Sequence, residues 1–101
     1  MKVTLTSLAK KSYNKNISYL EDYWNIEVLQ NFILEVERTI KIITENPNCF
    51  QDWEFDKKFK KGFINNRISF YYKIYPNEIV IYLFWNNYEN PEKLKYQLLS
   101  L

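Results

Sequence analysis

The sequence predicts an α+β protein in which an antiparallel sheet packs in two layers against a pair of helices. Two observations carry this prediction. Polar and apolar residues alternate near the N-terminus and again from Ile68 to Tyr75, which is the period of a half-buried strand. Between these stretches, apolar residues recur every three or four positions, as on the buried face of a helix. With 101 residues, 47% of them hydrophobic, we expect a single domain over residues 1–101.

The first predicted strand covers Lys2 to Thr6, with Val3 and Leu5 on one face. Thr6 or Ser7 then offers a side-chain oxygen that can cap the N-terminus of a helix. The apolar residues that follow share one helical face and are Leu8, Tyr13, Ile17, Leu20 and Trp24. We therefore expect a first helix that includes all of them.

A second helix is predicted after Asn25, which breaks the first helix and can cap the next one. Its apolar positions follow the helical period closely and are Leu29, Phe32, Ile33, Val36, Ile40 and Ile43. Asn46-Pro47 ends this helix, because proline lacks a backbone N–H and disfavours helical geometry in the residue before it.

A hairpin is predicted in the C-terminal half of the chain. Ile68 to Ile74 alternates between apolar and more polar residues, Pro76-Asn77 turns the chain, and Glu78 to Phe84 is apolar at nearly every position. The last stretch is therefore expected to be a central strand. An earlier strand is predicted to begin near Lys60.

Two segments have no clear period. From Cys49 to Lys61 aromatic and charged residues are mixed, and the pattern does not define the elements before the strand that begins near Lys60. The tail from Glu92 to Leu101 carries four leucines and is expected to dock on the domain as a short helix or a last strand. The predicted order is β-α-α-β-β-β with a short C-terminal element.

Cysteine usage and hydropathy favour a reducing compartment and no membrane partner. Cys49 is the only cysteine, so no intrachain disulfide can form, and we assign it no role. The N-terminus has no apolar stretch long enough for a signal peptide, and no run of about 18 apolar residues occurs. We therefore expect a cytoplasmic protein.

The residue types that are missing exclude several kinds of chemistry. Without histidine, the usual general base at neutral pH and most zinc sites are absent. Glu35 and Glu37 lie on different sides of a helix, so they lack metal-ligand spacing. The only glycine, Gly62, cannot form a glycine-rich phosphate loop. We predict no metal, no cofactor and no small-molecule substrate.

Charge is unevenly distributed, although the net charge is only +2. Every charged residue from Lys57 to Lys73 is cationic, whereas the segment from Ile17 to Glu45 is mostly acidic. One interpretation is a face that binds a polyanion through cations and stacked tyrosines. The other is a solvated lysine-rich loop with structural tyrosines. The residues concerned are Lys57, Lys58, Lys60, Lys61, Arg67, Lys73, Tyr71, Tyr75, Tyr88 and Tyr96.

Several stretches in a fixed order resemble the RelE/ParE toxins of bacterial type II toxin–antitoxin systems, particularly the branch known as plasmid-stabilisation proteins. They are the two helices, the basic entry to Ser69–Ile74, the strand Glu78–Trp85, and Asn90-Pro91 after it. No single motif is specific to the family. The ordered set spans nearly the whole chain and carries the resemblance.

The resemblance implies a two-helix, antiparallel-sheet fold and expression beside a cognate antitoxin, a segment of which wraps and neutralises the toxin. It also implies one of two cellular targets. RelE-like members enter the ribosome and cleave mRNA with cationic and tyrosine side chains. ParE-like members inhibit DNA gyrase and are not nucleases.

The resemblance assigns catalytic residues only for a RelE-like, metal-independent endoribonuclease. Lys60 or Lys61 would assist removal of the 2′-hydroxyl proton, and Arg67 would stabilise the phosphorane. Tyr96 would orient or protonate the leaving group. Tyr88 occupies the position where many relatives carry an arginine. A neutral phenol cannot replace such a cation, which is typically worth about 3 to 4 kcal/mol in the transition state.

Tyr88 therefore favours growth inhibition by a ParE-like route. A RelE-like ribosome-dependent nuclease and an attenuated toxin that serves only as an antitoxin-binding regulatory partner stay open. In each case the antitoxin is expected to add a helix to a groove beside the helix pair or a strand to the sheet edge. The aromatic residues that could line such grooves, with core packing as the competing role, are Trp24, Phe32, Trp53 and Trp85.

Overall fold

The computed structural model describes residues 1–101, which form three helices and a five-stranded sheet. The α+β class is confirmed. The observed order has one strand more than predicted, and the C-terminal element is a helix. The elements are β1 (Lys2–Leu5), α1 (Ser7–Tyr23), α2 (Ile26–Glu45), β2 (Gln51–Trp53), β3 (Asp56–Phe63), β4 (Ile68–Ile74), β5 (Glu78–Asn86) and α3 (Pro91–Leu99).

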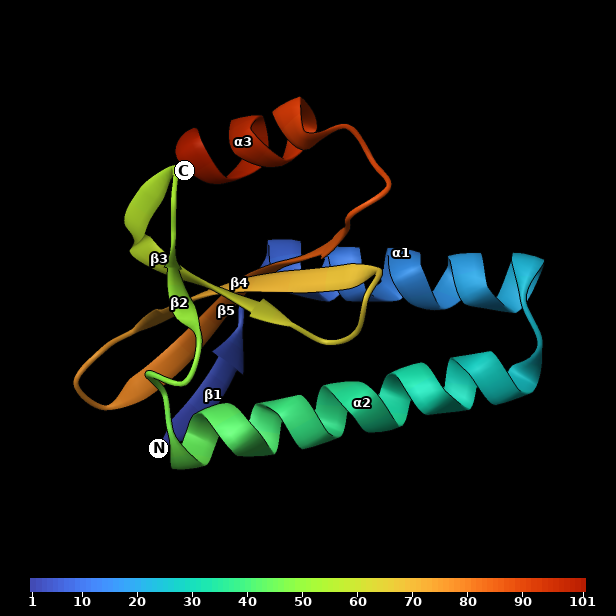
Figure 1. Ribbon diagram of the computed structural model, residues 1–101, viewed down its shortest axis with the longest axis horizontal. Coiled ribbons are helices and arrows are strands. Elements are labelled where there is room, and N and C mark those ends of the chain that lie inside the picture. The colour runs from blue at the N-terminus through green and yellow to red at the C-terminus, as the bar shows by residue number, and fades with distance from the viewer.

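The sheet has the strand order β1-β5-β4-β3-β2. The pairs from β2 to β5 are antiparallel, as predicted, but β1 pairs in parallel with β5, so the sheet is mixed. β5 returns beside β1 only after the helix pair, in which α2 runs back along α1 and ends near the N-terminus, and after the strands β2 to β4 (Figure 1). The Thr6 N–H donates to the Ile81 carbonyl at 3.0 Å beside this parallel pair. The apolar strand β5 is thereby central, as predicted.

Both N-terminal helices begin at the predicted caps. The Ala9 N–H donates to the Thr6 hydroxyl at 3.0 Å, and the Val28 N–H donates to the Asn25 side-chain oxygen at 2.9 Å. Trp24 is the one departure, because it lies just past the end of α1 with extended backbone instead of inside the helix. α2 ends before Pro47, for the backbone reasons that proline imposes.

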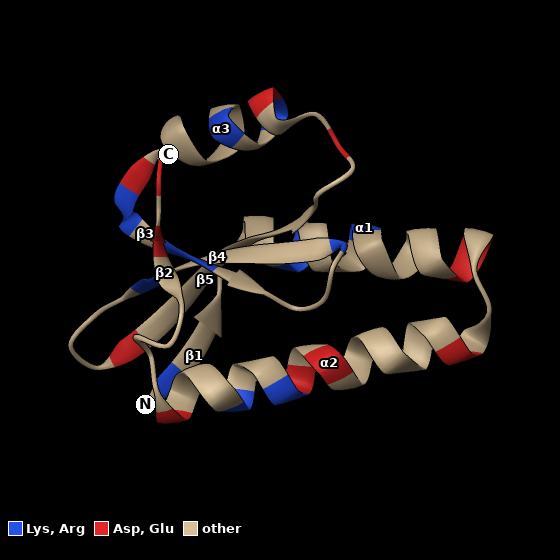
Figure 2. Ribbon diagram, in the orientation of Figure 1, with Lys and Arg blue, Asp and Glu red and all other residues tan.

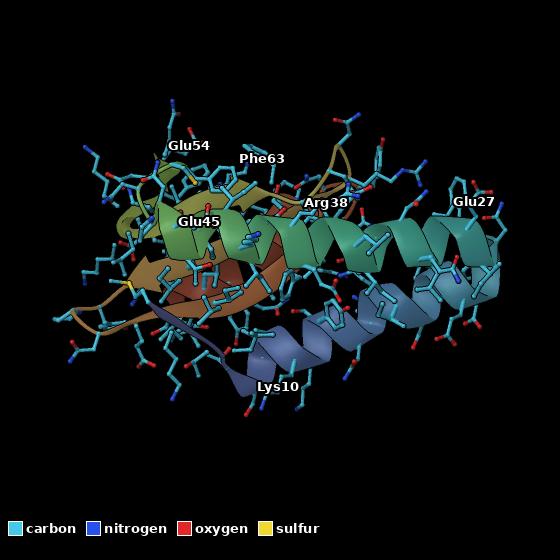
Figure 3. The ribbon with its side chains drawn as sticks, turned by 90° about the horizontal axis from the view of Figure 1, so that it is seen from below. Lys10, Glu27, Arg38, Glu45, Glu54 and Phe63 are labelled. Atoms are coloured by element: carbon cyan, nitrogen blue, oxygen red, sulfur yellow. The ribbon has the colours of Figure 1, made fainter.

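The helix pair covers one face of the sheet, and Figure 3 shows α2 in front of the strands with α1 beside it. From β4, this core receives the predicted alternating set, including Phe70 and Tyr72, which are fully buried. The core between helices and sheet consists of Ala9, Phe32, Val36, Ile43, Ile64, Ile68, Phe70, Tyr72, Ile79, Ile81 and Phe84.

A β-bulge at Tyr82 changes which residues of β5 face the helix pair. Tyr71 pairs with Leu83 and Tyr72 with Ile81, so Tyr82 is the extra residue. Before the bulge, Ile81 faces the helix pair; after it, Leu83 and Trp85 face the opposite side of the sheet. Because both sides of β5 carry large apolar residues, both faces of the sheet need cover.

The region from Cys49 to Lys61, where only a strand beginning near Lys60 was predicted, forms a short hairpin of β2 and β3. β3 begins at Asp56 and not near Lys60. The hairpin forms because Trp53 and Phe59 are both buried against the sheet face opposite the helix pair. Their spacing and the charges around them hide the strand period in the sequence. Cys49 itself is exposed.

The C-terminal tail forms α3 on the sheet face opposite α1 and α2 (Figure 1). Pro91 starts the helix, and the Asn90 side-chain oxygen accepts from the Glu92 N–H at 3.0 Å. Leu94 and Leu98 are buried against the sheet. The molecule is therefore two-layered over most of its area, with α3 as a partial third layer. No helix is long and apolar enough to cross a membrane.

Candidate functional site

The sheet face beneath α3 carries a second, smaller core and an open cleft beside it. Leu94 and Leu98 of α3 pack on aromatic and aliphatic residues from four strands. This core contains Trp53, Phe59, Tyr71, Leu83, Trp85, Leu94 and Leu98. Because α3 is only nine residues long, it covers part of this face and leaves the rest accessible.

The cleft lies between this sheet face and the N-terminal part of α3 and has a volume of about 320 Å³. Its walls combine indole and phenol rings with both kinds of charge. They are formed by Trp53, Glu54, Phe55, Lys61, Tyr71, Trp85, Asn87, Glu89, Pro91, Leu94 and Lys95. A volume of this size suits one small ligand or one nucleotide-sized group.

Tyr71 lines this cleft, and its hydroxyl group is buried without a hydrogen-bond partner. The side chain is fully buried, and no atom of the protein accepts or donates at its oxygen. Burial raises the pKa of Tyr71 to about 12, since the charged phenolate is disfavoured away from water. At neutral pH the group is therefore a neutral hydrogen-bond donor and not a base.

Lys61 stands beside Tyr71, because the two residues are paired across β3 and β4. Its ammonium nitrogen lies 5.5 Å from the ring centroid of Phe63 and forms no ion pair. Lys60, one residue earlier, points to the other side of the sheet, and its Nζ pairs with Asp52 at 2.9 Å. Strand alternation thus separates the two predicted lysines and leaves Lys61 as the free cation in the cleft.

Asn87 is fixed on the cleft wall by Ser69. The Ser69 hydroxyl donates to Asn87 Oδ1 at 3.1 Å, and Asn87 Nδ2 donates to the Ser69 oxygen at 2.9 Å. The Asn87 N–H also donates to the Arg67 carbonyl at 2.7 Å. These bonds hold the chain where it leaves β5, so this wall of the cleft is pre-formed.

Arg67 and Tyr88 lie together, away from Lys61. The Arg67 guanidinium carbon is 4.5 Å from the Trp24 ring centroid and 5.7 Å from that of Tyr88. Neither Arg67 nor Tyr88 lines the cleft beneath α3. Tyr96 is on the outer side of α3 and is 77% exposed, with Leu94 and Leu98 of the same helix turned inward. The predicted catalytic residues therefore do not converge on one point.

The cleft lining holds two cations, Lys61 and Lys95, and two acids, Glu54 and Glu89. Figure 2 shows Lys and Arg positions along β3 and on α3, while acidic positions recur along α2. Lys73 lies over the Phe59 and Tyr82 rings at 4.5 and 5.1 Å, and Lys95 lies over Phe55 at 3.9 Å. No group of three or more His, Cys, Asp or Glu side chains is close enough to hold a metal ion.

Among known proteins, the chain matches solved structures by its fold. No protein-family model and no curated protein matches the chain. A YoeB/ParE toxin from Agrobacterium tumefaciens superposes with a TM-score of 0.62 and 10% identity, over 87% of this chain and 100% of that chain. The chain has a RelE/ParE-type toxin fold.

Two further solved structures agree with this toxin fold. A conserved hypothetical protein from Helicobacter pylori gives a TM-score of 0.57 at 17% identity, over 88% of this chain and 97% of that chain. A copper-bound mutant toxin from Helicobacter pylori gives 0.56 at 17% identity, over 86% and 94% of the two chains. The resemblance seen in the sequence is thus confirmed as a similarity of fold.

Some residues of the cleft were predicted from the sequence, and others were not. Lys61 was a predicted site residue, and Tyr71 belonged to the wider set of cations and tyrosines. Trp53 and Trp85 are buried, which is the core-packing role considered for them, and both also line the cleft. Asn87 was missed. The signal was available, because alternation from Leu83 through Trp85 places Asn87 on the same face if the strand is extended past Phe84.

Proposed function

We propose that this protein is the toxin of a type II toxin–antitoxin pair, held inactive by a cognate antitoxin, and that it arrests growth by inhibiting DNA gyrase without cleaving RNA. The toxin assignment is supported by the RelE/ParE-type fold, which spans the full length of the Agrobacterium toxin. Because the proposed antitoxin and the proposed target are cytoplasmic, the protein would act in the cytoplasm.

The dispersal of the predicted catalytic residues supports inhibition without cleavage. Lys60 is neutralised by Asp52, Arg67 is stacked on Trp24, and Tyr96 faces solvent on the outer side of α3. Phosphoryl transfer needs cations aimed at the position where charge develops. None of these three residues lines the cleft that contains Lys61.

Growth and supercoiling assays test this proposal. Expression of the chain alone should arrest growth, and co-expression of the neighbouring antitoxin gene should restore it. Purified protein should slow the supercoiling of relaxed plasmid by purified gyrase. Lys61→Gln serves as the matched variant. It removes the free cation of the cleft, which only a nuclease would need, and should therefore leave gyrase inhibition unchanged. Normal growth on expression would support an attenuated regulatory partner, and uninhibited gyrase would count against the ParE-like route.

One observation favours a second candidate, the RelE-like ribosome-dependent nuclease. Lys61 and Tyr71 are cross-strand neighbours that both line a cleft walled by Trp53 and Trp85, and the buried Tyr71 hydroxyl has no partner. Such a cleft could bind a phosphate through Lys61 and stack a base on an indole. In this case Tyr71 would donate a proton or hydrogen bond, since its raised pKa prevents it from acting as a base.

Programmed ribosomes separate the two candidates. If the protein is a nuclease, it should cut the message in the ribosomal A site, and Lys61→Gln should reduce the cutting rate by about a hundredfold or more. Arg67→Ala tests the sequence-based assignment in the same assay, and it should have little effect because Arg67 lies outside the cleft. Intact message with the unaltered protein would eliminate the nuclease.

A further inference from the structure

A second pocket lies at the far end of the helix pair and shares no residue with the cleft beneath α3. It is formed where the end of α1 and the start of α2 meet the β3–β4 loop and the end of β5, and its volume is about 290 Å³. The lining residues are Asn16, Tyr19, Leu20, Trp24, Val28, Phe32, Asn65, Asn66, Arg67, Ile68 and Asn86.

The floor of this pocket is apolar. Leu20, Val28, Phe32 and Ile68 come from both helices and from the start of β4. Trp24 forms part of the wall and is 41% exposed. The volume and the aliphatic floor suit one or two apolar side chains of a ligand, whose burial would supply most of the binding free energy.

Arg67 is the only charged residue in the lining, which contains no carboxylate. It forms no ion pair, although it stacks on the Trp24 ring. A stacked guanidinium keeps its in-plane N–H groups free, and their fork matches the two oxygens of a carboxylate. The nearby acids Glu21 and Asp22 lie outside the lining. The pocket therefore complements an anion attached to an apolar body.

Three asparagine side chains offer free hydrogen-bonding atoms around the apolar floor. Asn16 is more than nine-tenths buried; its Nδ2 donates to the Ser12 carbonyl at 2.8 Å, which leaves Oδ1 free to accept. Asn65 and Asn86 accept backbone N–H groups through Oδ1 at 2.8 to 2.9 Å, which leaves each Nδ2 free to donate. A peptide backbone has both complementary groups.

We propose that this pocket binds a segment of a partner protein in which an apolar side chain stands next to an Asp or Glu. This inference rests on the proposed function only for the origin of the segment, which would then belong to the antitoxin. A nucleotide fits less well, because a terminal phosphate carries up to two charges against one arginine, and the floor is largely aliphatic.

Trp24 makes the binding measurable. Trp53 and Trp85 are only 2% and 5% exposed, so a change of tryptophan fluorescence on titration reports on Trp24. The probe is the blocked tetrapeptide acetyl-Leu-Leu-Asp-Leu-amide, and its matched control replaces Asp by Asn. The unaltered protein should bind the Asp peptide about tenfold more tightly than the Asn peptide.

Two variants test the role of charge. Arg67→Gln should bind the Asp peptide about tenfold more weakly and lose the preference for Asp over Asn. Arg38→Gln is the matched control, because it removes the same charge from an exposed position on α2 (Figure 3) and should bind as the unaltered protein does. Asn66→Asp keeps the Arg67–Trp24 contact but puts a carboxylate in the lining, and should weaken binding of the Asp peptide similarly.

Three results would overturn the inference. They are equal affinity of the unaltered protein for the two peptides, an equal loss of affinity for the Asp peptide in the Arg38 and Arg67 variants, and tighter binding of adenosine monophosphate than of either peptide. The titration measures peptide binding to the purified protein and does not depend on whether the protein is toxic. Peptide binding without growth arrest would therefore remove the toxin proposal and keep the pocket. Growth arrest without peptide binding would remove the pocket alone.

Discussion

Two neighbouring tyrosines on β4 show that the surroundings of a side chain determine whether its hydroxyl group finds a hydrogen-bond partner. Tyr71 and Tyr72 are both fully buried but face opposite sides of the sheet. The Tyr72 hydroxyl donates to the Pro47 carbonyl at 2.7 Å, whereas the Tyr71 hydroxyl has no partner. The first hydroxyl ties the end of α2 to the sheet, and the second is unsatisfied in the free protein.

The pair gives a matched prediction. Tyr72→Phe should lower the free energy of unfolding by about 1 kcal/mol, because a buried hydrogen bond is lost and a carbonyl loses its partner. Tyr71→Phe should leave that free energy unchanged or raise it by about 1 kcal/mol, since an unpaired buried polar group is removed. Urea unfolding of both variants measures the difference. A larger loss for Tyr71→Phe would show that its hydroxyl is satisfied in solution.

Gly62 is required by a close approach within the sheet. A Cβ atom built on Gly62 would collide with the ring of Phe70, which is fully buried and cannot move aside. Gly62→Ala should therefore lower the free energy of unfolding by about 1 to 3 kcal/mol. In a Phe70→Leu background the same substitution should cost less. Urea unfolding of the unaltered protein, the two single variants and the double variant gives the coupling free energy between Gly62 and Phe70. Additive losses of unfolding free energy would contradict the proposed collision.

At the scale of the elements, the bulge at Tyr82 and the helix α3 depend on each other. The bulge turns Leu83 and Trp85 to the face opposite the helix pair, and Leu94 and Leu98 of α3 bury that face. Without α3 this apolar surface would be open to solvent. The cleft exists because so short a helix covers only part of it.

Adjacent leucines on α3 test this dependence. Leu98 is 2% exposed and Leu99 is 49% exposed. Leu98→Ala should lower the free energy of unfolding by about 2 to 4 kcal/mol through lost burial and the cavity left behind. Leu99→Ala should change it by less than about 0.5 kcal/mol. Hydrogen exchange should also become faster along α3 in the Leu98 variant alone. Similar losses in the two variants would mean that α3 does not dock as described.

For the whole molecule, buried phenols link stability to pH. Burial raises the pKa of Tyr71 and of Tyr82 to about 12, and a hydrogen bond between the Tyr82 and Tyr75 hydroxyls at 2.7 Å adds to the shift at Tyr82. The folded protein thus holds these protons at a pH where the unfolded chain, with a tyrosine pKa of about 10, releases them.

The sign of the resulting prediction is fixed by this difference. The free energy of unfolding should not depend on these groups below about pH 10 and should fall as pH rises from about 10 to about 12. Tyr71→Phe should make the fall shallower, because one linked proton is removed. Urea unfolding at several pH values, with tyrosinate absorbance recorded in parallel, measures both effects. A free energy of unfolding that stays flat across this range would refute the linkage.

Elements with a strong hydrophobic period or a capping residue could be predicted from the sequence. Both long helices, their caps at Thr6 and Asn25, the stop before Pro47 and the strands β4 and β5 follow from local backbone chemistry and one-sided burial. The toxin-like fold was recognisable for the same reason, since the order of these elements is a property of the chain. Lys61 could be named as a candidate because it lies in a segment whose charged residues are all cationic.

The grouping of the candidate residues in space depends on tertiary contacts that the sequence does not reveal. Strand alternation separates Lys60 from Lys61, the start of α3 turns Tyr96 outward, and the loop before β4 carries Arg67 to Trp24. The parallel pairing of β1, the bulge at Tyr82 and the missing partner of the Tyr71 hydroxyl likewise depend on residues distant in sequence. A linear pattern records which face a residue takes within its own element, but not which other elements meet it there.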